Sequence, residues 1–186
     1  TTLGTTPTAL TSYFCRVHPS PLLALGAAAQ IKGITEAART SPFKGMPVLG
    51  AISPTRAGGT AGPLNFADIP AGPLRRRQIA ELHLYPNDIW GVPVTGEELL
   101  LWLEKAAAAF STPAELDRAG LVSPDVPCFD FDMLYGVTYE IDPTAPPRFD
   151  RNGQELNPAA RRVSNLRFDG EPVLGSDRFL VAATSY

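Results

Sequence analysis

The segment TGEELLLWLEKAAAAF, residues 95–110, carries the strongest structural signal in the chain. Thr95 and Glu98 match the S/T-x-x-E capping box, in which the two side chains satisfy backbone N–H groups at the start of a helix. Apolar residues then recur at helical spacing on one face, at Leu99, Trp102, Leu103 and Ala106. The pattern therefore predicts a helix whose apolar face, including Trp102, lies in the core.

A second helix is predicted over residues 21–38, because Ser20 and Pro21 suit the N-cap and first helical positions. Gly26 and Gly33 weaken this helix. Alternating or apolar runs predict strands over residues 46–52, 88–95, 136–142 and 177–185, and a hairpin with an Asp-Gly turn over residues 161–173. Residues 10–17 suit an extended segment or strand, while residues 74–84 have helical periodicity that leaves a strand open.

Length and composition fit one folded domain. The 186 residues are 44% hydrophobic and 19% charged, which is typical of a soluble globular protein and not of a disordered one. The uncharged segments are too short and interrupted to span a bilayer. Because helices and strands mix without a regular βαβ repeat, we predict an α+β fold, a single domain with a mixed β-sheet packed by helices.

The charge pattern and the sparse histidines exclude several function classes. A net charge of −3 provides no footprint for a nucleic-acid polymer, and the basic run at residues 75–77 is best explained as a solvated face. The two histidines, His18 and His83, stand in no metal-ligand pattern. Nucleophile-elbow, P-loop and dinucleotide motifs are absent from the sequence. We therefore expect no catalytic residue and no metal ligand in this chain.

The cysteines and the first residues leave alternatives open. Cys15 and Cys128 form no CxxC or metal spacing, so they are either a disulfide in an oxidising compartment or two buried thiols. The chain begins TTLGTTPTAL without a methionine, and we expect it to be a piece of a longer protein. The lack of a signal peptide then says nothing about location.

The remaining chemistry is that of recognition. The turn in ELHLYPNDIW places Tyr85 beside Asn87, and Tyr186 ends the apolar run VAATSY. Arg56 lies in the glycine-rich and proline-rich loop of residues 53–73, and loops this long in a compact domain are usually functional or disordered. Two tyrosine rings that face each other would form a slot for a nucleobase, with the amide and guanidinium groups fixing its orientation.

Four segments occur in an order typical of one family: SPTRAGGTAGPLNFADIPAGPL, IAELHLYPNDIWGVPVTGEELLLWLEKAAAAF, FDFDMLYGVTYEID and FLVAATSY. Together they resemble the C-terminal domain of the 5′-nucleotidase family, in particular its periplasmic 2′,3′-cyclic-nucleotide 2′-phosphodiesterase/3′-nucleotidases. No single motif is diagnostic, but the ordered set is specific and extends over nearly the whole chain.

The resemblance implies a division into residues 1–18, a linker from a missing catalytic domain, and residues 19–186, a substrate-binding domain. Tyr85 falls on one ring of the family's base sandwich and Tyr186 on the other, while Asn87 falls on the polar amide. Arg56 matches the family's arginine, although AISPTRAGG departs from the common GGGIR form. The glycine-rich tail that follows the second ring in the family is absent here.

The resemblance also implies the partners. Nucleosides, nucleotides and cyclic nucleotides are the expected ligands, and an N-terminal metallophosphoesterase domain is the expected partner domain. Divalent metal ions are expected in that domain and no cofactor in this chain. The implied location is the periplasm or another secreted compartment, with no membrane partner.

Two other function classes also fit the sequence. A structural or protein-interaction domain would pack Tyr85 and Tyr186 into its core and would have no ligand slot. A self-sufficient phosphatase would need metal ligands that the sequence scarcely provides.

Overall fold

The computed structural model describes residues 1–59, 62–80 and 85–185. In chain order the elements are β1 Thr2–Thr6, β2 Leu10–Thr11, α1 Pro21–Ala38, β3 Val48–Ile52, β4 Asp68–Ile69, β5 Gly72–Arg75, α2 Arg76–Ala80, β6 Ile89–Thr95, α3 Gly96–Ala107, α4 Leu116–Ala119, the 3₁₀ turn Cys128–Asp130, β7 Met133–Tyr135, β8 Thr138–Ile141, β9 Val163–Phe168, β10 Glu171–Pro172 and β11 Arg178–Thr184.

A four-stranded mixed sheet in the order β6-β11-β3-β7 forms the centre of the fold. β11 runs parallel to β3 and antiparallel to β6, while β7 runs antiparallel to β3. The α+β class with a mixed sheet is thus confirmed. Smaller sheets pair β1 with β5, β2 with β4, and β8 and β10 with β9.

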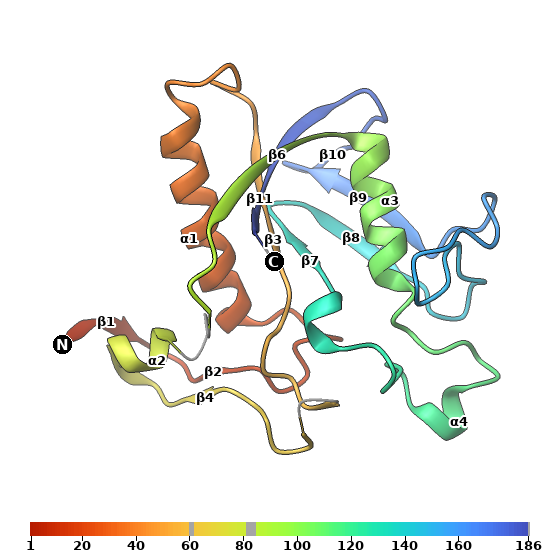
Figure 1. Ribbon diagram of the computed structural model, residues 1–186, viewed down its shortest axis with the longest axis horizontal. Coiled ribbons are helices and arrows are strands. Elements are labelled where there is room, and N and C mark those ends of the chain that lie inside the picture. Colours follow the sequence, from red (N-terminus) through yellow and green to blue (C-terminus); the bar gives the residue numbers. More distant parts are fainter. Residues whose placement is uncertain (60–61, 81–84, 186) are drawn as a thin grey trace.

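The central sheet is covered on both faces, with α1 on one side and α3 on the other (Figure 1). On β11, Leu180 and Ala182 pack with the α1 side, whereas Phe179 and Val181 pack with the α3 side. This alternation follows from the two-residue period of a strand, and burial on both faces explains why FLVAA is uniformly apolar. α1 approaches the sheet closely at Gly50, where an added Cβ would lie 3.1 Å from the Cβ of Ala27.

Local sequence signals predicted several elements correctly. The helix predicted over residues 21–38 is α1, although the Ser20 hydroxyl donates to the carbonyl oxygen of Thr11 at 3.1 Å instead of capping the helix. Both hydrogen bonds of the capping box at Thr95 and Glu98 are present. The hairpin of β9 and β10 turns through the predicted Asp-Gly pair, residues 169–170, both at positive φ.

Two predicted segments differ from the structure. Residues 74–84 do not begin as a helix, because β5 continues to Arg75 in pairing with β1, and α2 then ends at Ala80. Residues 81–84 lie outside the described residues. Residues 10–17 form a strand only at Leu10–Thr11, because Ser12 bonds to both backbone groups of Ala67 and the chain then turns. Here tertiary pairing overrides the local periodicity.

Two buried charged residues connect α3 to the loops beyond it. Arg162 is 1% exposed, and its guanidinium group donates to four backbone carbonyl oxygens, those of Ala107, Phe110, Pro143 and Ala145. The carboxylate of Glu104, also 1% exposed, accepts hydrogen bonds from the backbone N–H groups of Arg162 and Val163. Ala107 is the last residue of α3 and Phe110 lies in the turn that follows, so Arg162 binds the carboxyl end of this helix and the turn after it from within the core.

Among the described residues, no helix is long and apolar enough to cross a membrane.

Candidate functional site

Three connections between strands and the residue after β11 meet at one edge of the central sheet, where two of its strands end and the other two begin. Because β3 and β11 are parallel, both end at this edge, and their antiparallel neighbours β6 and β7 begin there. The site edge, as we name it, consists of residues 53–56 after β3, residues 85–88 before β6, Asp132 before β7 and Ser185 after β11. Crevices at the carboxyl ends of strands are common ligand sites in open sheets that contain helices.

The turn before β6 presents an aromatic ring to solvent. The N–H group of Asn87 donates to the carbonyl oxygen of Tyr85 at 2.9 Å, which closes a three-residue turn around Pro86. The Tyr85 side chain is 66% exposed, and Asn87 is exposed as well. The alternative that packs Tyr85 into the core is therefore not what the structure contains.

The end of β11 is bonded to this same turn. The Ser185 N–H donates to the carbonyl oxygen of Asp88 at 2.8 Å, and the Asp88 N–H donates to the Ser185 hydroxyl at 3.2 Å. The register of β6 and β11 produces this contact, since Thr184 lies opposite Ile89. Tyr186, the expected second ring, lies outside the described residues. Ser185, the residue before it, is hydrogen-bonded to Asp88, which follows Tyr85 by three residues in the sequence.

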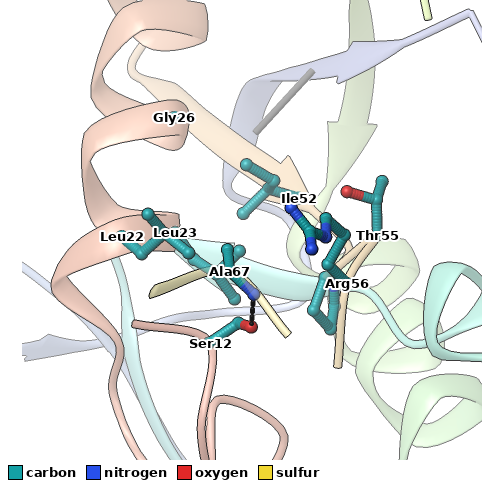
Figure 2. Close-up of a pocket in the computed structure, with 9 residues that line it drawn as sticks. Ser12, Leu22, Leu23, Gly26, Ile52, Thr55, Arg56 and Ala67 are labelled. Atoms are coloured by element: carbon teal, nitrogen blue, oxygen red, sulfur yellow. Dashed lines mark hydrogen bonds between the residues drawn. The ribbon is translucent and has the colours of Figure 1, made fainter. Parts of the chain in front are cut away.

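Arg56 lies at the same edge but on the α1 side of the sheet. Its Nε donates to Asn65 Oδ1 at 3.0 Å, so this hydrogen bond stays within the loop. The side chain also lines a pocket of about 10 Å³, room for one water molecule, between the start of α1 and the end of β3 (Figure 2). Figure 2 shows the Arg56 side chain directed from its loop toward Ile52.

The loop that carries Arg56 is folded back on itself. Ala57 pairs with Phe66, and the Gly58 N–H donates to the carbonyl oxygen of Asn65 at 2.9 Å. Gly58 has a φ of 70°, and an added Cβ would lie 2.8 Å from the Phe66 ring, so this turn requires glycine. The long loop is thus an ordered support for Arg56 over its described part.

Strand order separates Arg56 from the Tyr85 turn. β11 lies between β3 and β6, and neighbouring strands are about 5 Å apart, so the two connections leave the sheet roughly 10 Å from each other. The topology therefore brings Tyr85, Asn87 and the end of β11 into one group and places Arg56 across the next strand.

Sequence reasoning missed one polar group at the site edge. Asp132 accepts a hydrogen bond from the Ser53 hydroxyl at 2.5 Å and another from Trp102 Nε1 at 2.8 Å. Trp102 was expected in the core; it is half-buried, with its indole N–H used by this carboxylate. An acidic residue directly before a buried strand, in FDFDMLY, is the signal that could have found it. Asp132 holds the first residue of the loop that leads to Arg56.

A second hollow lies on the outer face of α3, away from the predicted residues. It has a volume of about 580 Å³ and is lined by Glu98, Leu101, Trp102, Lys105, Arg148, Phe149 and Glu155. Its charges are already engaged, since Arg148 pairs with Glu155 at 2.7 Å and Lys105 lies 5.5 Å from the centre of the Phe149 ring. Arg56, Tyr85 and Asn87, the predicted binding residues that the structure describes, do not line this hollow.

Potential metal ligands are dispersed in the described part of the chain. Over residues 1–59, 62–80 and 85–185, no group of three or more histidine, cysteine, aspartate or glutamate side chains is arranged to hold a metal ion. His18 is exposed, and its Nδ1 lies 2.9 Å from the carbonyl oxygen of Pro19. His83 lies outside the described residues.

Known proteins match this sequence over nearly the whole chain. The sequence profile of the 5′-nucleotidase C-terminal domain matches residues 2–186. The trifunctional nucleotide phosphoesterase YfkN of Bacillus subtilis is 32% identical over 186 residues, a match that covers 99% of this chain and 13% of that protein. A 2′,3′-cyclic-nucleotide 2′-phosphodiesterase/3′-nucleotidase of Haemophilus influenzae is 33% identical over 180 residues, covering 94% of this chain and 27% of that protein.

A solved structure agrees on the fold. A crystal structure from Staphylococcus aureus, assigned as a 5′-nucleotidase, superposes with a TM-score of 0.64 over all of this chain and 31% of its own, at 18% identity. The chain spans about a quarter or less of the length of the Bacillus subtilis and Haemophilus influenzae relatives. With a profile match over almost every residue and relatives more than 30% identical, the chain belongs to the 5′-nucleotidase family, as its C-terminal domain.

Proposed function

We propose that this domain binds the nucleoside part of a nucleotide substrate for a 2′,3′-cyclic-nucleotide 2′-phosphodiesterase/3′-nucleotidase. The base lies between the rings of Tyr85 and Tyr186. The observation that carries the proposal is the pair of hydrogen bonds between Asp88 and Ser185, which join the exposed Tyr85 turn to the end of β11.

The chemistry of the site suits a base and its sugar. An exposed tyrosine has a flat apolar face and little rotamer entropy to lose, and stacking of one base on such a ring is worth roughly 1–3 kcal/mol. The Asn87 amide has both a donor and an acceptor for the polar edge of the base. The Arg56 guanidinium, farther along the edge, suits the ribose hydroxyls or a phosphate oxygen.

The same proposal assigns hydrolysis to another part of the parent protein. Curated relatives that carry names of nucleotide phosphoesterases are several times longer than this chain. We place the divalent metal ions, which would polarise the phosphoester, in a separate metallophosphoesterase domain, and the parent protein in the periplasm or another secreted compartment. The residues of this domain then hold the nucleoside and present the phosphate by proximity.

Titration of the purified chain with adenosine and with 3′-AMP, followed by calorimetry, tests the clamp. Tyr85→Ala should weaken binding by about 5- to 150-fold, the equivalent of one stacking contact. Tyr85→Phe keeps the ring and should bind like the unchanged chain. Leu174→Ala removes an exposed apolar side chain near the opposite edge of the sheet, beside Gly96, and is the surface control.

Equal affinities for Tyr85→Ala and Tyr85→Phe would refute stacking at this ring. Absence of any nucleoside binding by the unchanged chain, at millimolar ligand, would favour the structural or protein-interaction alternative. Metal-dependent turnover by the isolated chain would overturn the assignment of hydrolysis to another domain.

A further inference from the structure

Two buried cysteines lie in segments that are distant in sequence but packed together. Cys15 is 1% exposed in the turn before α1, and Cys128 is 2% exposed at the start of the 3₁₀ turn before β7. Their sulfur atoms are not bonded to each other in this structure. Neither thiol belongs to the site edge.

Contacts of Arg16 show that the two segments touch on both sides of Cys128. Arg16 Nη2 donates to the carbonyl oxygen of Val126 at 3.3 Å, and its guanidinium carbon lies 5.7 Å from the centre of the Phe131 ring. The residue after Cys15 thus contacts residues that precede and follow Cys128. Met133 adds a second link, because it packs against the cluster that contains Cys15 and against the cluster of Val126 and Phe131.

The electrostatics agree with this proximity. Burial, together with the negative charge of a Cys128 thiolate, raises the pKa of the Cys15 thiol to about 11, although the positive charge of Arg16 acts in the opposite direction. An influence of Cys128 on Cys15 agrees with the contacts of Arg16 and Met133, which place the two segments side by side in the core. At neutral pH, Cys15 in the folded protein is therefore a protonated, slowly reacting thiol.

We propose that Cys15 and Cys128 are the two halves of an intramolecular disulfide that forms as the chain folds in an oxidising compartment. The cross-link would fasten the segment that leads into α1 to the segment that leads into β7. It closes a loop of more than a hundred residues, the kind of closure that most restricts the unfolded chain. The proposal does not depend on nucleoside binding.

The oxidant in this reaction is a small-molecule disulfide. One cysteine thiolate attacks a sulfur atom of the oxidant, which breaks the oxidant's S–S bond, forms a mixed disulfide and releases one small thiolate. The second cysteine thiolate attacks the protein sulfur of that mixed disulfide, forms the Cys15–Cys128 bond and releases the second small thiolate. The protons of the two cysteines pass to the released thiolates, so two protein thiols are oxidised and one small disulfide is reduced.

Refolding of the reduced chain in oxidised and reduced glutathione, followed by mass spectrometry under denaturing conditions, tests the pairing. The oxidised product should be lighter than the reduced chain by two hydrogen atoms and should resist alkylation until a reductant is added to the unfolded protein. Its melting temperature should exceed that of the reduced chain by about 10 °C. Cys15→Ala and Cys128→Ala, singly, should each retain one alkylatable thiol or one glutathione adduct.

The double variant Cys15→Ala/Cys128→Ala should melt at one temperature under both redox conditions, and it is the matched control. Two glutathione adducts, two alkylatable thiols in the product refolded under oxidising conditions, or a disulfide that lowers the melting temperature would overturn the proposal. The mass readout is made on the unchanged sequence and does not require that any variant folds.

Discussion

The buried guanidinium of Arg162 offers the sharpest test of how this fold is held together. Its replacement by methionine keeps much of the side-chain volume but leaves four backbone carbonyl oxygens without their charged donor. The carboxylate of Glu104, buried in the same region, also loses the attraction of the Arg162 charge. One of the carbonyl groups lies at the end of α3, one in the turn that follows it and two in the loop after β8, so these segments lose their shared anchor.

The expected cost follows from these contacts. Hydrogen bonds to a charged group contribute about 1.5–3 kcal/mol each, but methionine regains apolar burial and water reaches some of the freed carbonyl groups. Removal of one charge from a buried, compensated set costs about 3–5 kcal/mol. We therefore expect Arg162→Met to lower the free energy of unfolding by about 4 kcal/mol, and Arg162→Lys by about half as much, since an ammonium group reaches fewer of the four carbonyl groups.

Urea unfolding followed by circular dichroism measures this difference. Arg161→Met is the matched control, because Arg161 is the adjacent arginine, is exposed, and donates to the carbonyl groups of Pro158 and Ala160, which are close in sequence. It should change stability by less than about 0.5 kcal/mol. Equal unfolding free energies for Arg162→Met and Arg161→Met would refute the role we assign to the buried group.

Three further predictions concern local structure. Thr95→Ala removes the side-chain half of the capping box and should cost about 1 kcal/mol at neutral pH. The backbone N–H and the hydroxyl of Thr95 hold the pKa of Glu98 below its usual 4.5, so the unchanged chain should lose stability as pH falls below about 4.5. The variant keeps only the backbone hydrogen bond and should lose less stability, as acid titration of the melting temperature would show. Gly96→Ala should lower the free energy of unfolding by several kcal/mol, because the new Cβ would collide with the backbone oxygen of Leu174. Gly33→Ala, inside α1 with open space around it, should raise the free energy of unfolding by about 0.5–1 kcal/mol in the same urea assay. Burial raises the pKa of Tyr135 from 10.0 to about 12, so the stability that the neutral phenol contributes below pH 10 should be lost as pH rises toward 12. In Tyr135→Phe the melting temperature should decrease less over this pH range.

The elements that were predicted correctly are those whose sequence signals are local. α1 and the capped start of α3 were predictable because their signals lie within a few residues of each other. The hairpin of β9 and β10 was predictable for the same reason, since an Asp-Gly pair joins two strand-like runs. The helical periodicity of residues 74–84 did not predict β5, because this strand forms through pairing with β1, about seventy residues earlier in the chain.

The candidate site shows the same division. The residue types at Tyr85 and Asn87, together with the order of the four family segments, were readable without coordinates. That the Tyr85 ring is exposed and that the turn is bonded to the end of β11 required the register of two strands almost a hundred residues apart. Asp132 escaped notice because its partners, Ser53 and Trp102, come from separate elements.

The sequence by itself determined the class of fold, the family and the chemical character of the binding residues, because these depend on composition, short-range patterns and motif order. Only the tertiary structure decided which strand ends share an edge, that Arg56 lies across β11 from Tyr85, and that Arg162 is buried beneath α3. The physical reason is that strand register and side-chain burial result from contacts between distant segments. The segments that carry Cys15 and Cys128 are one more such pair, joined by contacts of Arg16 and Met133 that no local pattern encodes.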